Sequence, residues 1–128
     1  MTYCSRIGEG LVNKRKLGDE YEKLAVDFLE KEGFTIIERN FRNRYGEIDI
    51  IANEDGQICF CEVKYRSNIA CGQAVEAVNY HKQKKITNVA YYYLMTHGMN
   101  EWTPCRFDII AIDGDNITLF RNAFESTI

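Results

Sequence analysis

The sequence predicts an α/β fold in which helices flank a mixed β-sheet, with the elements in the order α-β-β-β-α-β-β. Three observations carry this prediction. Two segments have apolar residues at helical spacing, five short segments are rich in β-branched residues, and turn signals separate the strands. The chain has 128 residues, enough for one core and too few for two. One domain is therefore expected over residues 17–128, after a loosely ordered basic arm over residues 1–16.

The first half of the chain is expected to form one helix and three strands. The helix is predicted over residues 17–32, where apolar residues recur at helical spacing and Gly33 follows as a stop. Asp55 and Gly56 give a hairpin signal between the second and third strands. The third strand is the most apolar and is expected at the centre of the sheet. The three strands are predicted at residues 34–40, 46–52 and 58–64.

The second half is expected to contain a long helix and two further strands. Apolar residues on one side of residues 72–96 predict the helix, which is long enough to connect parallel strands. The strands are predicted at residues 106–112 and 116–121, with a turn at Gly114-Asp115 between them.

The composition is that of an ordinary globular protein, with 45% hydrophobic and 27% charged residues. No apolar run approaches the roughly 20 residues needed to span a bilayer, and the first residues lack the apolar core of a signal peptide. A cytoplasmic protein that does not bind membranes is therefore expected. Five irregularly spaced cysteines fit a reducing compartment, and Cys59 and Cys61 are expected to fill the core rather than bind zinc.

The charge is unevenly distributed. A net charge of −3 argues against a protein that coats DNA without regard to sequence. Half of the lysines and arginines nevertheless fall between residues 39 and 85, around the acidic cluster described next. A basic rim around an acidic pocket suits a metal-dependent nuclease. The candidate phosphate contacts in this stretch are Arg42, Arg44, Arg66, Lys82 and Lys85.

Two carboxylates and a lysine are expected to meet at the hairpin. Asp49 lies in the second predicted strand, and Glu62 and Lys64 lie in the third. Side chains alternate along a strand, so Glu62 and Lys64 point to the same face, and the hairpin can bring Asp49 beside them. Carboxylate oxygens are ligands for Mg²⁺ or Mn²⁺, and the lysine can orient a water or contact a phosphate oxygen. The cluster is typical of a site that cuts phosphodiester bonds, and a structural Glu62–Lys64 ion pair is the alternative.

Further residues extend this pattern. Glu22 lies where the apolar and polar faces of the first helix meet, so it either reaches the metal pocket or is an exposed helix residue. Glu47 is expected to pair with Arg42 or Arg44. The tyrosines of the second helix either stack on bases or, as is commoner at helical spacing, join the core. They are Tyr80, Tyr91, Tyr92 and Tyr93. Asp108 is expected to form a structural ion pair with Arg106.

Several motifs together resemble the YraN-like family of bacterial proteins. That family is similar to the PD-(D/E)xK restriction-endonuclease-like nucleases and more closely to archaeal Holliday-junction resolvases. The resemblance covers residues 17 to about 121. It rests on Gly18-x-x-x-Glu22-x-x-Ala25, Arg39-Asn40-Phe41-Arg42, Gly46-Glu47-Ile48-Asp49-Ile50-Ile51-Ala52, Phe60-x-Glu62-Val63-Lys64-x-Arg66, Lys82-x-x-Lys85-Ile86 and Arg106-Phe107-Asp108.

The resemblance implies a restriction-endonuclease-like core and a role for each site residue. Asp49 and Glu62 would bind the metal ion together with the Val63 carbonyl, Lys64 would be the catalytic lysine, and Glu22 would be the acidic residue of the first helix. The implied substrate is DNA of branched or distorted shape, for which a homodimer would suit a two-fold junction. Two alternatives stay open. One is a non-catalytic nucleic-acid-binding module of the same fold, and the other is a protein-interaction domain that uses the tyrosine-rich helix surface.

Overall fold

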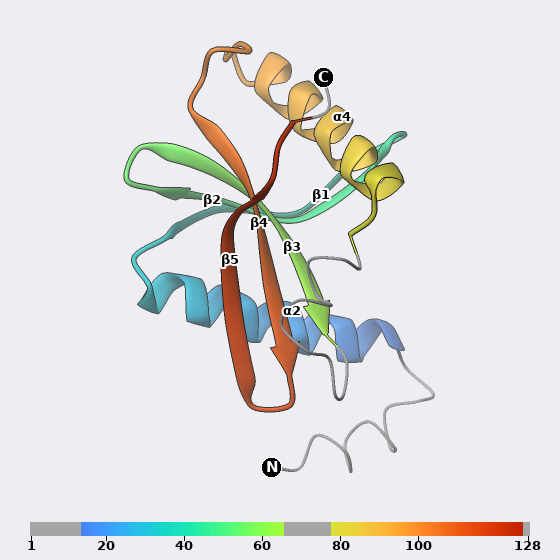
Figure 1. Cartoon of the computed structure of the whole chain (residues 1–128), viewed down its shortest axis with the longest axis vertical. Coiled ribbons are helices and arrows are strands. Elements are labelled where there is room, and N and C mark those ends of the chain that lie inside the picture. The colour runs from blue at the N-terminus through green and yellow to red at the C-terminus, as the bar shows by residue number, and fades with distance from the viewer. Residues whose placement is uncertain (1–13, 66–77, 127–128) are drawn as a thin grey trace.

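The computed structural model describes residues 14–65 and 78–126, which form one five-stranded sheet with a helix on each face (Figure 1). The strands lie in chain order, and all neighbours are antiparallel except β3 and β4, which are parallel. The α/β class, the mixed sheet and the predicted element order are confirmed. The elements are α2 (Lys14–Lys31), β1 (Thr35–Asn43), β2 (Gly46–Glu54), β3 (Gln57–Tyr65), α4 (Tyr80–Thr96), β4 (Cys105–Asp113) and β5 (Asn116–Phe124).

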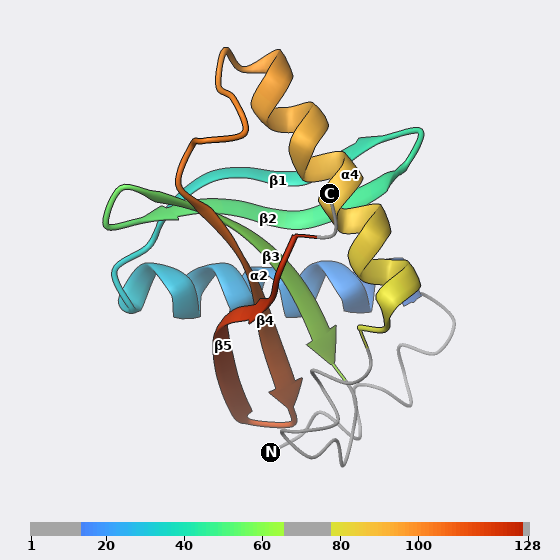
Figure 2. The same ribbon diagram turned by 45° about the horizontal axis from the view of Figure 1, so that its top comes forward.

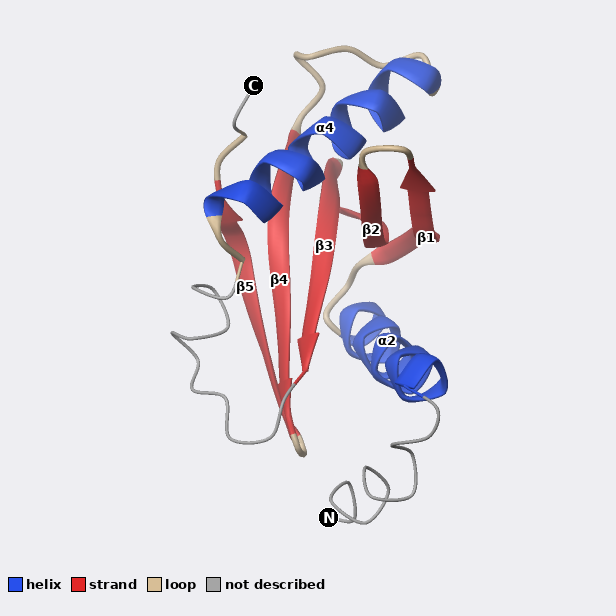
Figure 3. Cartoon of the chain, turned by 90° about the vertical axis from the view of Figure 1, so that its right-hand side faces the viewer, coloured by secondary structure: helices blue, strands red, loops and turns tan. Residues whose placement is uncertain are grey.

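The two helices bury separate cores against opposite faces of the sheet, as the turned views show (Figures 2 and 3). On one face, Leu29 of α2 packs in a cluster with Ile50 and Cys61 of the sheet. On the other face, Val89 and Tyr93 of α4 cluster with residues that include Phe60. Since the side chains of a strand alternate between faces, β3 supplies both cores.

Strand β3 occupies the centre of the sheet, as its apolar sequence predicted. Every residue from Ile58 to Val63 is buried, so a charged side chain at this end of the strand is placed against the core. Cys59 and Cys61 are 0% and 1% exposed and fill space in the core, also as predicted. Burial raises the pKa of the Cys59 thiol to about 12, which makes it an unreactive thiol.

A buried ion pair fixes the start of β4. Asp108 is fully buried and accepts a hydrogen bond of 2.9 Å from Arg106 Nε, so the predicted structural pair is present. Arg106 also contacts Glu54 and Gln57, and Glu54 in turn pairs with Arg121. The network joins β2, β3, β4 and β5 on one side of the sheet.

Both predicted helix starts differ from the observed ones, and the strand ends differ by up to three residues. The first helix begins at Lys14, so the last three residues of the predicted arm form its first turn, and residues 1–13 lie outside the described part. The second described helix begins at Tyr80 and not near residue 72. Asn79 has extended backbone angles, and its side chain accepts a hydrogen bond from the Lys82 amide, as an N-cap does. Residues 66–77, with the candidate phosphate contact Arg66, lie outside the described residues.

Removing the cap of α4 gives a first testable prediction. Asn79→Ala is expected to lower the free energy of unfolding by about 1 kcal/mol, because the Lys82 amide loses its acceptor. Asn79→Ser keeps a capping oxygen and serves as the control, with a change of a few tenths of a kcal/mol. Urea unfolding followed by circular dichroism measures both. Equal losses in the two variants would contradict the capping role.

Within the described residues, neither helix is long and apolar enough to cross a membrane.

Candidate metal and nucleic-acid site

The candidate site lies where β2 and β3 separate. The two strands pair from Glu54–Gln57 as far as Ile50–Cys61, and the next residue of β2 is Asp49. Asp49 Oδ2 accepts a hydrogen bond of 2.9 Å from the Val63 amide. A side-chain oxygen thus replaces the backbone carbonyl that this amide would otherwise bind in the β-ladder. The N–H and C=O groups of one strand residue point to the same side of the strand. The Val63 carbonyl is therefore directed into the same fork.

Glu62 provides the second carboxylate of the site. It is only 5% exposed, and its Oε2 lies 3.5 Å from Lys64 Nζ and 3.4 Å from Lys82 Nζ. Glu62 and Lys64 share one face of β3, as strand alternation predicted, whereas Val63 packs in the core on the α2 face. Lys82 comes from the first turn of α4. One carboxylate thus faces two ammonium groups from two different elements.

Asp49 and Glu62 are close enough to perturb each other. The pKa of Asp49 is raised to about 8, chiefly by burial and then by the charge of Glu62, which outweigh the opposing effect of the Val63 amide. Glu22 adds a smaller repulsion of the same sign. Two carboxyl groups in this confined space therefore favour either a shared proton or a bound cation near neutral pH.

Glu22 reaches toward the same site from α2. Its pKa is raised mainly by burial, and its Oε1 is buried with no hydrogen-bond partner in the described part of the chain. Arg39 Nη2 lies 3.7 Å from that oxygen. Glu22 borders a hollow of about 500 Å³ between α2 and the β1–β2 hairpin. The hollow is lined by Gly18, Asp19, Glu22, Asn40, Arg42, Glu47 and Tyr65.

Gly18 and Ala25 allow α2 to lie this close to the sheet. Ala25 is completely buried in the core, and a Cβ atom at Gly18 would lie 3.3 Å from the Tyr65 hydroxyl. Tyr65 stacks on Tyr21 with ring centroids 4.3 Å apart. These two small residues therefore permit a close approach of α2, which places Glu22 beside the end of β3.

The predicted phosphate contacts fall into two groups. Lys82 belongs to the site itself through Glu62, whereas Arg42 pairs with Glu47 at 2.9 Å, the partner expected from the sequence. Arg44 and Lys85 lie farther out, at the tip of the β1–β2 hairpin and on the exposed surface of α4. Of the four tyrosines of α4, Tyr93 is in the core, and Tyr80, Tyr91 and Tyr92 are exposed.

Within the described ranges, no three His, Cys, Asp or Glu side chains form a ready-made metal site. The donors directed into the fork are two carboxylates and one backbone carbonyl. This hard oxygen set fits Mg²⁺ or Mn²⁺, which keep several water ligands and need few from the protein. The raised pKa values of Asp49 and Glu22 both indicate buried carboxyl groups that a cation would stabilise in their charged form.

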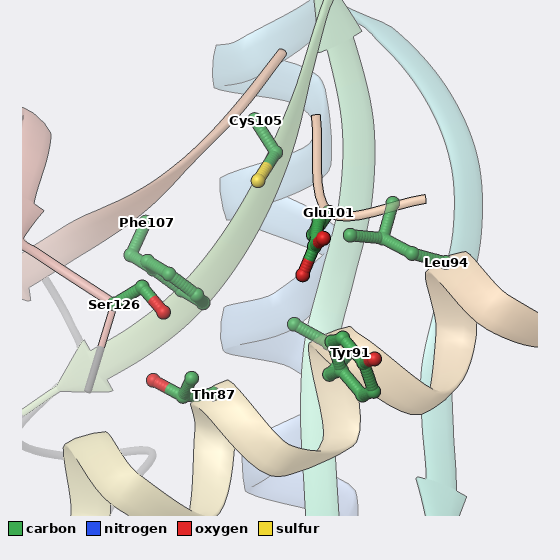
Figure 4. Close-up of a pocket in the computed structure, with 8 residues that line it drawn as sticks. Thr87, Tyr91, Leu94, Glu101, Cys105, Phe107 and Ser126 are labelled. Atoms are coloured by element: carbon green, nitrogen blue, oxygen red, sulfur yellow. The ribbon is translucent and has the colours of Figure 1, made fainter. Parts of the chain in front are cut away.

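A second hollow lies apart from these residues. It has a volume of about 290 Å³ and lies between α4 and the start of β4, with Cys105 and Glu101 directed toward it (Figure 4). Phe107, Leu94 and Ala90 make much of its wall apolar. It contains none of the predicted site residues.

The sequence prediction missed two residues at the site. Arg39 faces Glu22, and Asn40 supplies a hydrogen bond that lowers the pKa of Glu22 against the effect of burial. Asn40 has a positive φ of 54°, which is uncommon outside glycine. Both residues lie in the Arg39-Asn40-Phe41-Arg42 motif, so the motif itself was the signal that could have identified them.

Comparison with known proteins identifies the family. The profile of the uncharacterised protein family UPF0102 matches residues 21–112, more than half of the chain. The chain belongs to this family. It is the YraN-like family that the sequence motifs resembled.

Three UPF0102 proteins illustrate the similarity. One from Lachnoclostridium phytofermentans is 44% identical, covering 90% of this chain and 98% of its own. One from Vibrio vulnificus is 44% identical, covering 89% of this chain and 96% of its own. One from Clostridioides difficile is 46% identical, covering 79% of this chain and 88% of its own. Among solved structures, the crystal structure of SSO0001 has a TM-score of 0.44 and 19% identity, covering 91% of this chain and 55% of that one.

Proposed function

We propose that this UPF0102 protein is a metal-dependent nuclease that hydrolyses phosphodiester bonds in DNA, with branched or distorted DNA as its substrate. One observation carries the proposal. The Asp49 carboxylate binds the Val63 amide in the fork between β2 and β3, beside a buried Glu62 that faces Lys64 and Lys82. Buried charges are costly to keep unless they are paired or bind metal, so such a cluster points to function.

Each residue of the site would have a separate role in phosphodiester hydrolysis. Asp49, Glu62 and the Val63 carbonyl would hold Mg²⁺ or Mn²⁺, and Glu22 would act from α2, directly or through water. A cation in this position polarises a phosphate oxygen and lowers the pKa of a bound water. Lys64 is placed to orient the attacking water or to neutralise charge that develops on the phosphate. Lys82, 3.4 Å from Glu62, can move to a phosphate oxygen when Glu62 turns to a cation.

The proposed DNA substrate is supported by the charge around the site. Arg44 and Lys85 extend the positive charge away from the carboxylates. Contacts of this kind bind phosphates and recognise shape more than base sequence. A homodimer would suit a two-fold branched substrate.

One observation favours a second function. The Glu62 carboxylate is already paired with the ammonium groups of Lys64 and Lys82, so its negative charge is compensated without a metal cation. A non-catalytic nucleic-acid-binding module with the same fold would keep these ion pairs as structure. It would bind DNA without divalent ions, and binding would survive Glu62→Ala and Lys64→Ala.

Cleavage assays separate the two functions. Single-stranded, duplex, flap and four-way DNA substrates are incubated with the protein and Mn²⁺. The wild type is expected to cut at least one of them, and Asp49→Ala and Lys64→Ala are expected to be inactive. Asp27→Ala is the matched control, because Asp27 is an exposed carboxylate on α2. Activity that persists equally in the Asp49 and Lys64 variants would exclude this site as a nuclease centre.

A further inference from the structure

An exposed aromatic and basic surface adjoins the candidate site and takes no part in the chemistry proposed there. It lies where the tip of the β1–β2 hairpin meets α4, beside α4 in Figure 1. The hairpin packs closely on the helix at this point. A Cβ atom at Gly46 would lie 3.6 Å from Val89 Cγ2 and 3.8 Å from Lys85 Cβ. The surface consists of Arg44, Tyr45, Lys85 and Tyr92 and is called the tip surface below.

The tip surface presents two aromatic rings to solvent. Tyr45 and Tyr92 are 44% and 46% exposed, although each carries a ring that could be buried in a core. Arg44 holds Tyr45 in place, because its Nη2 donates a hydrogen bond of 2.9 Å to the Tyr45 hydroxyl and its guanidinium lies 5.0 Å from the ring centroid. The hydrogen bond with Tyr45 is the main cause of the raised pKa of Arg44, and Tyr92 adds a smaller effect of the same sign. A positively charged group and ordered rings thus share one exposed surface.

Exposed rings beside positive charges are the combination that binds unpaired bases. Every base has a flat π-face that stacks on an aromatic side chain, and the neighbouring cation attracts the phosphate backbone. Paired bases in an uninterrupted duplex are already stacked on each other and cannot insert between protein rings. The tip surface therefore suits single-stranded DNA better than duplex.

The position of the tip surface relative to Lys82 fits one continuous strand of DNA. Lys82 and Tyr92 are both on α4, and ten residues of helix span about 15 Å. With about 3.4 Å per stacked nucleotide, this distance corresponds to at most four nucleotides, and fewer in an extended strand. Lys85 lies between the two positions along the helix and can contact the intervening phosphates.

We propose that the tip surface binds unpaired bases of single-stranded DNA by stacking, a few nucleotides from the phosphate held at Lys64 and Lys82. The proposal rests on the proposed function only for the position of that phosphate. It narrows the substrate class to DNA with an unpaired segment next to the cleaved bond.

Binding measured without divalent ions, in an Asp49→Ala background, tests stacking separately from cleavage. The probe is a short single-stranded oligodeoxynucleotide with a 2-aminopurine base, compared with the same strand annealed to its complement. Tyr45→Ala and Tyr92→Ala are each expected to weaken binding of the single strand by about fivefold or more. Tyr45→Phe and Tyr92→Phe keep the ring and are expected to stay within about twofold. Quenching of 2-aminopurine fluorescence on binding reports stacking directly.

Trp102→Ala is the matched control, because Trp102 is 84% exposed and lies on the loop after α4, outside the tip surface. Its affinity should equal that of the parent. The proposal is overturned if Tyr45→Ala and Tyr92→Ala bind like Trp102→Ala, if the duplex binds as tightly as the single strand, or if binding causes no quenching. Absence of nuclease activity in the protein with intact Asp49 would leave the stacking result standing and would refute only the proposed chemistry.

Discussion

Asp49→Asn is expected to stabilise the protein by about 2–4 kcal/mol at pH 8 and to remove its response to Mg²⁺ and Mn²⁺. In the folded protein the pKa of Asp49 is raised to about 8, from an ordinary value of 3.8. Asparagine has no charge to desolvate, and its side-chain oxygen can still accept the hydrogen bond from the Val63 amide. Glu62 then keeps Lys64 and Lys82 without a neighbouring carboxylate.

The pH dependence of this effect has a definite sign. Between pH 3.8 and about pH 8 the folded state binds more protons at Asp49 than the unfolded state does. The contribution of Asp49 to stability therefore falls as the pH rises through that range. Well below pH 3.8 both states are protonated, and the advantage of the asparagine variant should disappear. Burial of Asp49 is the main cause of this behaviour, followed by the charge of Glu62 on β3 and, more weakly, of Glu22 on α2.

Urea unfolding at pH 5 and pH 8, followed by far-ultraviolet circular dichroism, measures the effect. Trp102 is 84% exposed and would be a poor fluorescence probe of unfolding. In the wild type, Mn²⁺ should raise the melting temperature more at pH 8 than at pH 6, because the cation must displace a proton. Asp27→Asn, which changes an exposed carboxylate, should alter neither quantity. If Asp49→Asn loses stability at pH 8, or keeps the Mn²⁺ response, then Asp49 and Glu62 do not act as an interacting carboxylate pair.

Much of the fold could be predicted because local signals and tertiary structure agree. The apolar run from Ile58 to Cys61 is buried throughout, as a strand at the centre of the sheet should be. Asp55 and Gly56 both have positive φ, the geometry that the Asp-Gly hairpin signal requires. These features depend on a few neighbouring residues, so the sequence reports them directly.

The fork at Asp49 could not be predicted from strand alternation. Ile48 and Ile51 both pack in the core on the α4 face, whereas strict alternation would place them on opposite faces. The alternation is broken between them, next to the left-handed backbone of Asn40 on β1. Beside this break, the Asp49 side chain reaches across to the Val63 amide of β3. Periodicity alone does not report such a break in alternation.

Contacts between distant elements were also only partly predictable. The sequence predicts Lys82 as a phosphate contact, but its distance of 3.4 Å from Glu62 depends on where the helix begins. Apolar spacing extended the helix to residue 72, whereas the cap at Asn79 sets the described start at Tyr80. The start of the helix fixes the turn that faces β3, and thus places Lys82 at the site.

Asp108→Ala is expected to cost about 3–5 kcal/mol of unfolding free energy, because it removes one partner of a buried ion pair. Asp108 is fully buried and accepts from Arg106 Nε and from the Asn122 amide, each at 2.9 Å. The β4–β5 register shifts between Phe107 and Ile109. The Asp108 side chain therefore accepts the hydrogen bond of the Asn122 amide, which has no backbone partner in the β-ladder. Alanine leaves both donors without this acceptor beside a fully buried position, and Arg106 keeps Glu54 and Gln57 as polar partners.

Two further variants separate the charge from the hydrogen bonds. Asp108→Asn keeps an acceptor for Asn122 and should lose about half as much stability. Arg121→Ala removes a side chain that is 44% exposed and should cost less than about 1 kcal/mol. Thermal unfolding at one pH measures all three. A loss below about 1 kcal/mol for Asp108→Ala, or equal losses for Asp108→Ala and Arg121→Ala, would contradict the argument.

The same variant tests what the Arg106-Phe107-Asp108 motif does. Its polar atoms face Glu54, Gln57 and Asn122, and none of these residues lines the fork at Asp49. DNA binding by Asp108→Ala, measured well below its melting temperature, should therefore equal that of the wild type. Asp49→Asn should behave in the opposite way, gaining stability at pH 8 while losing its metal response. A residue whose loss destabilises the protein and a carboxylate whose loss stabilises it cannot have the same role.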